Sequence, residues 1–230
     1  HLIERLKKEK VIIFAFKKPS SITGPLENEI VRSGVGVFDV DITNFKSVQS
    51  AVDKIHPEVI FHLAAFTDAE RDSSAIDRCI KINVQGTSNL LRALAKTPYR
   101  CFVNFSSTEV YGPGASPFKE SQCPKPISPY GISKLAAEHI CNFFYEIYHR
   151  PTVNLRSVMV YGEYQPINKI IPHVILSCLT GPDLYMTSGQ QTRDFVYVGD
   201  VVEALIKASY KKNAIGKTIN IGSGKEITIR

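Results

Sequence analysis

The stretch CFVNF at residues 101–105 and the stretch VNLRSV at residues 153–158 flank a long segment, residues 130–148, and these three together decide the fold class. Both short stretches are rich in β-branched and aromatic residues, as expected of strands covered on both faces of a parallel sheet. The segment between them carries apolar residues at helical spacing, among them Leu135, Ile140 and Phe144. A strand, a helix and a second strand make a βαβ unit, so the sequence predicts a parallel sheet with helices against its faces.

The same alternation extends toward the N-terminus. We expect strands at residues 10–16, 36–40 and 58–63, and helices at residues 2–8, 45–55 and 83–96. This order predicts an α/β fold of the Rossmann type, built on a doubly wound parallel sheet. After residue 161 proline and glycine interrupt shorter segments, which indicates that a second, smaller region begins near residue 163.

The start of the chain departs from the usual order of this fold. A doubly wound dinucleotide-binding fold opens with a strand, a glycine-rich turn and a helix whose N-terminus holds the pyrophosphate. Here the first pattern is already helical, and the pair Gly34 and Gly36 leads into a strand, so we predict a simple turn there. We therefore expect the first strand and the glycine-rich phosphate loop to be absent from this sequence.

Composition excludes several classes of protein. With 43% hydrophobic residues in 230 and a mean hydropathy of -0.06, the chain can bury a core, and no run approaches the roughly 20 apolar residues that a membrane helix needs. Its net charge of +6 is dispersed, which argues against nucleic acid and suits a small phosphorylated ligand. Five cysteines without a C-x-x-C pair and six histidines without a metal spacing predict neither disulfides nor a metal site. We expect a cytoplasmic protein.

The sharpest chemical pattern is Ser107 followed by Tyr130 and Lys134. Residues four apart on a helix lie on one face, so the lysine can reach the tyrosine. Lowering a phenol pKa from about 10 to about 7 requires roughly 4 kcal/mol. We expect the lysine, a cationic nicotinamide and partial desolvation to supply it together. An exposed helix pair without catalytic meaning is the alternative.

The chain resembles the extended short-chain dehydrogenase/reductase family, in particular its nucleotide-sugar epimerases and dehydratases such as UDP-glucose 4-epimerase. The motifs that carry the resemblance follow one another through the whole sequence: Asp41-Ile42, residues 62–65 (HLAA), residues 83–87 (NVQGT), residues 106–112 (SSTEVYG), residues 130–134 (YGISK), residues 155–162 (LRSVMVYG) and residues 193–198 (RDFVYV). The resemblance implies a dinucleotide-binding Rossmann domain at residues 1–162 and part of a substrate-binding region at residues 163–230. It also implies a homodimer.

Catalytic roles follow from the resemblance. It implies that Tyr130 is the acid/base on a sugar hydroxyl, that Lys134 holds the nicotinamide ribose, and that Ser107 binds the same sugar oxygen. Arg193 would grip the diphosphate of a nucleotide sugar, since a guanidinium fork suits phosphate oxygens. A salt bridge from Arg193 to Asp194 or Asp200 is the alternative.

Cofactor residues follow in the same way. Asp41 and Ile42 would flank the adenine, and Asn83 would hydrogen-bond near the active site, with plain N-capping of its helix as the alternative. Further candidates are Leu63, Ala64 and Ala65 after the third predicted strand, and Lys17 and Lys18 after the first. NAD is the expected cofactor. The two lysines and the lack of an acid between residues 10 and 26 keep NADP open, and His62 is expected to be packed rather than catalytic.

The reaction depends on the fate of the ketone formed when hydride leaves the sugar C4. We expect 4-epimerisation of a nucleotide hexose through a 4-keto intermediate. Glu109 could instead be the base of a 4,6-dehydratase, although its neighbour Thr108 is no carboxylic acid and could at best position a water. An NADPH-dependent 4-keto-sugar reductase and a non-catalytic dinucleotide sensor complete the alternatives.

Overall fold

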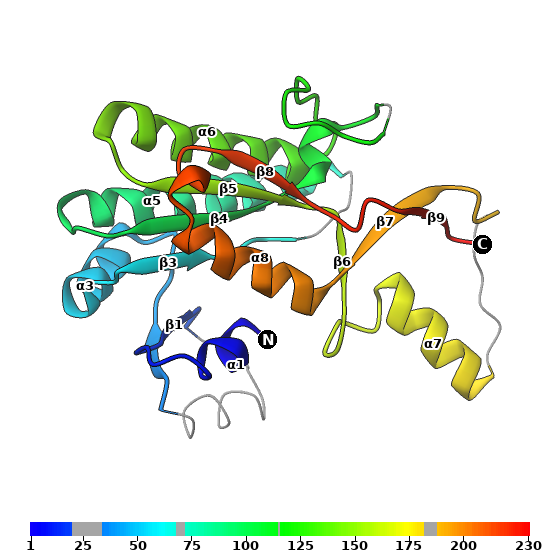
Figure 1. Ribbon diagram of the computed structural model, residues 1–230, viewed down its shortest axis with the longest axis horizontal. Helices are drawn as coiled ribbons and strands as arrows, with labels where there is room; N and C mark the ends of the chain where they lie inside the picture. Colours follow the sequence, from blue (N-terminus) through cyan, green and yellow to red (C-terminus); the bar gives the residue numbers. More distant parts are fainter. Residues whose placement is uncertain (20–33, 68–71, 115, 182–187) are drawn as a thin grey trace.

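A parallel four-stranded sheet forms the centre of the protein (Figure 1). The computed structural model describes residues 1–19, 34–67, 72–114, 116–181 and 188–230. The strands follow in the order β3 (Val59–His62), β4 (Cys101–Ser107), β5 (Thr152–Ser157) and β8 (Thr218–Ile221). Every neighbouring pair is parallel, which confirms the predicted α/β class with a parallel sheet.

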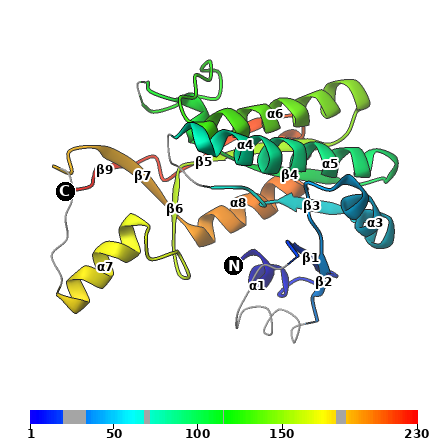
Figure 2. The same cartoon turned by 180° about the vertical axis from the view of Figure 1, so that it is seen from behind.

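Helices cover both faces of this sheet (Figures 1 and 2). On one face lie α3 (Phe45–Ile55), α5 (Gly86–Ala93) and α6 (Pro129–Tyr148), and on the other lies α8 (Val198–Tyr210). Alternate residues of β4 serve the two cores, because successive strand side chains point to opposite faces. Phe102 packs with the helices of the first face, and Val103 packs with Leu205 of α8. The sheet is therefore buried on both sides.

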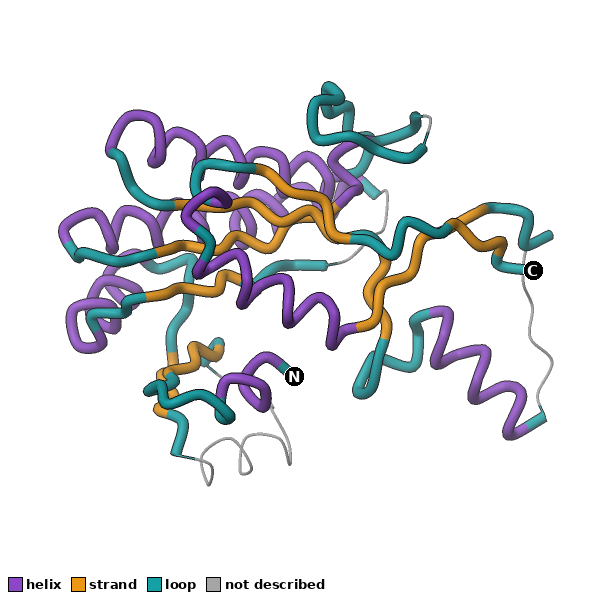
Figure 3. Tube along the Cα trace, viewed as in Figure 1, coloured by secondary structure: helices purple, strands orange, loops and turns teal. Residues whose placement is uncertain are grey.

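A second pair of strands lies beside α1 (Leu2–Leu6) (Figure 3). β1 (Phe14–Lys17) runs parallel to β2 (Gly36–Asp39). Among the described residues this pair has no hydrogen bonds to β3. The turn predicted at Gly34 is confirmed, since Gly34 has a φ of 79° and Gly36 begins β2.

The first predicted strand and helix are longer than the observed ones. The strand expected over residues 10–16 starts at Phe14, while Val11 and Ile12 are exposed and belong to no strand. The helix expected over residues 2–8 ends at Leu6. Apolar residues make a strand only where a neighbouring strand offers hydrogen bonds, and β2 pairs with β1 from Phe14 onward.

The region after residue 161 contributes strands to two sheets. Its strands β7 (Thr192–Tyr197) and β9 (Glu226–Thr228) form a separate small sheet with β6 (Met159–Tyr161), the strand just before this region, and α7 (Ile170–Thr180) lies nearby (Figure 1). β8, in contrast, pairs with β5 of the main sheet, and α8 packs on β4 and β5. The boundary predicted at residue 162 therefore does not coincide with the limit of the main sheet. Whether residues 163–230 belong to a separate domain stays a prediction.

The helix predicted over residues 83–96 begins earlier and changes its winding. It runs through α4 (Ile76–Cys79), a π-helical stretch η2 (Ile80–Gln85) and α5, and ends in the 3₁₀ turn η3 (Leu94–Lys96). Other short turns are η1 (Ser73–Ala75), η4 (Thr108–Tyr111) and η5 (Lys212–Ala214). π-helical stretches are rare and frequently mark functional positions.

Three expected absences can be compared with the described part of the chain. No helix there has the length and apolarity to cross a membrane. No group of three or more metal-ligating side chains gathers in those same ranges. All five cysteines have free thiols.

Candidate active site

The N-terminal turn of α6 places Tyr130 and Lys134 beside the end of β4. Ser128 caps the helix, and its hydroxyl accepts a hydrogen bond from the Gly131 backbone N–H at 3.0 Å. Pro129 occupies the first turn, where a backbone N–H would have no partner within the helix, so its lack of an N–H costs nothing there. Gly131 permits the close approach to η4, because a Cβ there would lie 2.8 Å from the carbonyl oxygen of Glu109. The start of α6 is thus packed directly against the turn that follows β4.

The Ser107 side chain lies close enough to the Tyr130 phenol to influence its pKa. Burial raises the pKa of Tyr130 to about 12, and Ser107 only partly opposes this shift. The expectation that desolvation would help to lower this pKa is wrong in sign. Removing water disfavours the charged phenolate, so positive charge and hydrogen bonding have to oppose burial for the phenol to become acidic.

Lys134 is buried one helical turn after Tyr130, with 4% of its surface exposed. Burial lowers its pKa to about 8, and Cys141 and Glu138 on the same helix oppose the shift. Within the described residues Lys134 forms no ion pair. The Lys134 side chain is therefore mostly protonated at neutral pH, and no carboxylate of the described residues forms an ion pair with it.

Asn83 links two parts of the site from the π-helical stretch. Its side-chain amide donates to the Ser133 hydroxyl at 2.8 Å and to the Phe66 carbonyl at 3.1 Å, and its side-chain oxygen accepts from the Phe66 N–H at 2.7 Å. Ser133 lies directly before Lys134 on α6, and Phe66 belongs to the segment that follows β3. Asn83 therefore bonds near the predicted active site and does not cap a helix.

His62 is packed at the end of β3, as expected. Its Nε2 lies 2.9 Å from the Thr87 hydroxyl, which in turn donates to the Asn83 carbonyl at 2.6 Å. Burial, aided by the charge of Lys134, lowers the pKa of His62 to about 3. The imidazole is therefore neutral at physiological pH.

Glu109 lies beside the cap of α6. Its side chain is exposed and accepts a hydrogen bond from the Ser128 hydroxyl at 3.1 Å, while its N–H donates to the Ser107 hydroxyl at 3.2 Å. Thr108 donates to the Ser157 carbonyl at 3.4 Å. Glu109 is thus placed next to Ser107 and the start of α6, whereas the Thr108 hydroxyl is engaged with the neighbouring strand.

The predicted adenine residues follow β2. Asp41 accepts hydrogen bonds from the Thr43 N–H at 2.9 Å and the Thr43 hydroxyl at 2.8 Å, and these two bonds lower its pKa. The carbonyl of Ile42 accepts from the Asn89 side chain at 2.9 Å. Asp41 thus forms a turn after the strand, which is the alternative to a role at the adenine, and one carboxylate oxygen, Oδ2, takes no part in those two bonds.

The lysines considered for a 2′-phosphate lie close to acids. Lys17 forms an ion pair with Asp39 of the adjacent strand at 3.2 Å, and the positive charge of Lys18 acts on Asp41. An acidic side chain of β2, Asp39, thus lies beside the end of β1. Leu63 and Ala64 are exposed and Ala65 is half-buried after β3.

Arg193 does not lie beside Tyr130 and Lys134 of α6 but on β7, in the small sheet. Its side chain is exposed and donates to the Thr192 carbonyl at 2.7 Å. Neither alternative partner, Asp194 or Asp200, forms an ion pair with it among the described residues. Asp194 instead accepts from the N–H and the hydroxyl of Ser223.

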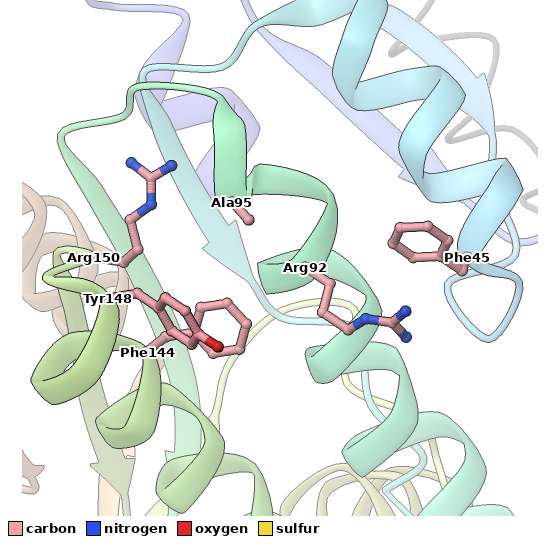
Figure 4. A pocket seen from close by; sticks show the side chains of 6 residues that line it. All are labelled: Phe45, Arg92, Ala95, Phe144, Tyr148 and Arg150. Carbon is pink, nitrogen blue, oxygen red and sulfur yellow. The ribbon is translucent and has the colours of Figure 1, made fainter.

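A separate cavity lies at the other end of α6. It has a volume of about 430 Å³ and is lined by Phe45, Arg92, Ala95, Phe144, Tyr148 and Arg150 (Figure 4). Phe144 follows Tyr130 by 14 positions, which separates the two by about 21 Å along a helix. This cavity is therefore not part of the site around Tyr130.

Comparisons with known proteins define the class of this protein. Residues 1–222 match the family described as the NAD dependent epimerase/dehydratase family, and the chain belongs to it. It is an extended short-chain dehydrogenase/reductase, as its motifs indicated, and the Rossmann-type fold is confirmed.

Curated relatives include both of the reaction types expected from the sequence. The chain is 32% identical over 210 residues to dTDP-glucose 4,6-dehydratase of Haemophilus influenzae, covering 84% of this chain and 61% of that protein. It is 32% identical over 174 residues to the uncharacterized UDP-glucose epimerase YtcB of Bacillus subtilis, covering 75% of this chain and 55% of the relative. The chain thus spans a little more than half the length of these relatives.

Solved structures share the fold. UDP-glucuronic acid 4-epimerase from Bacillus cereus, in complex with UDP-glucuronic acid and NAD, superposes with a TM-score of 0.89 at 29% identity, covering 100% of this chain and 75% of that one. UDP-glucose 4-epimerase of Thermus thermophilus with NAD gives a TM-score of 0.88 at 28% identity, covering 100% and 76%. The family is NAD-dependent, and these two members were crystallised with NAD.

Proposed function

We propose that this chain carries the NAD-binding and acid/base part of a nucleotide-sugar 4-epimerase. The observation that supports the proposal most strongly is the proximity of the Ser107 side chain to Tyr130, with Lys134 buried one helical turn away and in no ion pair among the described residues. A buried ammonium without a carboxylate suits the neutral hydroxyls of a ribose. Asp41 at the end of β2 suits the adenosine end of a dinucleotide. The residues present thus fit NAD.

The chain's own side chains divide the work on the sugar. Tyr130 takes the proton from the 4-hydroxyl as hydride leaves C4, and it returns that proton when the ketone is reduced. Ser107 hydrogen-bonds the same oxygen, and Lys134 holds the ribose and favours the phenolate by its charge. NAD, when bound, would supply the hydride acceptor and donor that epimerisation at C4 requires, and a second positive charge.

NAD suits the site better than NADP. A 2′-phosphate would need cationic partners at the end of β1, where Lys17 is already held by Asp39 at 3.2 Å. The carboxylates of Asp39 and Asp41 near this position would repel a phosphate. This charge arrangement also argues against the NADPH-dependent reductase.

A 4,6-dehydratase is the second candidate function. Glu109 is exposed beside the catalytic pair, and a relative of this chain is named a dTDP-glucose 4,6-dehydratase. The neighbouring Thr108 hydroxyl donates to a backbone carbonyl, so it supplies no acid for expelling the C6 hydroxyl. A threonine in place of an acid at residue 108 favours epimerisation.

The reaction can be tested with purified protein, NAD and a panel of UDP-, dTDP- and GDP-sugars. NMR analysis of products should find a 4-epimer, with no net change in NAD. A 4-keto-6-deoxy sugar would identify a dehydratase instead. If the protein binds NAD and converts none of these sugars, the catalytic proposal is wrong and a sensor role is favoured.

We further propose that the protein is a homodimer. α6 presents an apolar stripe with Ile132, Phe143 and Ile147 exposed, and the neighbouring α4–η2 helix exposes Ile76 and Ile80. Exposed apolar stripes of this kind often mark interfaces between subunits. Light scattering after size-exclusion chromatography should give twice the mass of one chain, and a monomer would contradict the proposal.

A further inference from the structure

A buried ion pair joins α6, one helical turn after Lys134, to β5. Glu138 of α6 is 2% exposed and Arg156 of β5 is 5% exposed. The guanidinium donates from Nη2 to Glu138 Oε2 at 2.6 Å and from Nε to both carboxylate oxygens at 3.0 and 3.2 Å. Ser106 of β4 donates a further hydrogen bond to Glu138. One carboxylate therefore ties α6 to two strands of the sheet.

The position of this carboxylate connects it to catalysis. Tyr130, Lys134 and Glu138 follow one another at intervals of four residues, so they share one face of α6. Ser106, which bonds Glu138, directly precedes Ser107 on β4. The Glu138 contacts thus hold both the helix that carries Tyr130 and the strand that carries Ser107.

The pair also reaches the turn after β4 and the last strand of the sheet. The Arg156 guanidinium carbon lies 4.7 Å from the centre of the Tyr111 ring in η4. The Tyr111 hydroxyl in turn donates to the Asn220 side chain of β8 at 2.8 Å. The same cluster therefore fixes the turn that carries Glu109.

Stability alone is a poor reason for such a pair. Removing two charges from water is costly, and well-packed apolar residues are often at least as stable in the same place. Among the described residues the buried Arg156 Nη1 also has no hydrogen-bond partner, which adds to the cost. A fork of directional bonds does, however, fix the rotation and the axial position of a helix, and a slide by one residue, about 1.5 Å, would break it.

We propose that Glu138, with Arg156 as its counter-ion, is a positioning residue that sets α6 so that Tyr130 and Lys134 meet Ser107. The inference rests on the proposed function, because it assigns these three residues to catalysis. The charge of Glu138 has a second effect, since it favours the ammonium form of Lys134. Cys141 on α6 acts in the same direction, and His62 on β3 is the other titratable group that interacts with Lys134.

The double variant Glu138→Leu/Arg156→Met tests this by replacing the pair with apolar residues, so that no charge is left buried alone. Folding should be retained, and KM for the nucleotide sugar should change by less than about twofold, while kcat falls by about tenfold or more, because misplacement by about 1 Å is enough for such losses. The alkaline limb of kcat should also move to lower pH, since Lys134 loses a favourable charge.

Two further measurements make the test decisive. Backbone amides of residues 130–134 should exchange hydrogen faster in the double variant, which is measurable without any substrate. Asn142→Leu is the matched control, because it removes a 2.9 Å bond from Asn154 at the same α6–β5 contact but further from Tyr130, and its kcat should equal that of wild type. Glu138→Gln keeps the shape of the side chain, and serves in the same assays if the double variant does not fold.

A folded double variant with wild-type kcat, pH profile and amide exchange would overturn the inference. If wild type itself converts no nucleotide sugar, the proposed function fails separately. The exchange rates then still decide the positioning role: faster exchange at residues 130–134 supports it, and unchanged exchange contradicts it.

Discussion

Replacing Asn83 by alanine should destabilise the protein more than its small loss of volume suggests. The side chain is 2% exposed and forms three hydrogen bonds, two with the backbone of Phe66 and one with Ser133. Each bond contributes about 1 kcal/mol to the free energy of unfolding. The expected loss is therefore about 3 kcal/mol, which corresponds to a fall in Tm of about 6–12 °C for a chain of this size.

Asn89→Ala is the matched control. Asn89 is 3% exposed, lies on the same helix and forms one hydrogen bond, to the carbonyl of Ile42 at 2.9 Å. Its loss should cost about 1 kcal/mol. Because both variants remove the same atoms, the difference between them isolates the two additional hydrogen bonds.

Urea unfolding of both variants, followed by circular dichroism, measures these free energies. NAD affinity should also fall in Asn83→Ala and not in Asn89→Ala, since the segment at Phe66 loses its attachment to α6. Equal losses of stability in the two variants would refute the reasoning, because the hydrogen bonds around the π-helical stretch would then contribute nothing specific.

Three further predictions concern other parts of the site. The free energy of unfolding should fall by about 2 kcal/mol between pH 7 and pH 5 because of His62. Its pKa is about 3 in the folded protein and 6.5 ordinarily, so the unfolded chain binds more protons in this pH range. His62→Gln should lose this part of the pH dependence, measured by urea titrations at the two pH values. Arg193→Ala should raise KM for the nucleotide sugar about tenfold and leave kcat unchanged in steady-state assays, because a diphosphate contact acts equally on ground state and transition state; a fall in kcat alone would contradict that role. Gly131→Ala should lower kcat by about tenfold or more with little change in Tm, since the added Cβ would lie 2.8 Å from the Glu109 carbonyl and push α6 away from η4 while alanine favours the helix; unchanged kinetics would show that this close approach is not needed.

Local signals made several elements predictable from the sequence. The helix over residues 45–55 was expected with its observed bounds, and the structure shows why: Asn44 caps its start and His56 ends it in the left-handed conformation. Three of the four strands of the main sheet, β3, β4 and β5, were located because each is a short apolar run whose side chains pack on both faces.

Other elements depended on contacts that sequence order does not show. α8 has a clear helical pattern, with Val201, Val202 and Leu205 buried, yet only short segments interrupted by proline and glycine were expected after residue 161. The π-helical stretch changes the phase of a helix by one residue, and a pattern of apolar positions does not reveal this.

The candidate site was predicted in its centre and missed at its supports. Tyr130 and Lys134 follow from a spacing of four residues. The supporting side chains Ser128, Ser133 and Thr87 instead bond to residues of other segments, namely Glu109, Asn83 and His62. Glu138 left no comparable signal, because it lies on the side of the predicted helix away from the apolar residues Ile140 and Phe144. Its partner Arg156 stands on a strand, and the pair could be found only in three dimensions.

Tyr130→Phe tests the central claim most directly. NAD affinity, measured by calorimetry, should stay close to that of wild type, because the phenyl ring keeps the packing. Turnover of the nucleotide sugar should fall by about 10²–10⁴-fold, as expected when a positioned acid/base group is removed. Turnover within about threefold of wild type would contradict the assignment of the Tyr130 hydroxyl as the acid/base.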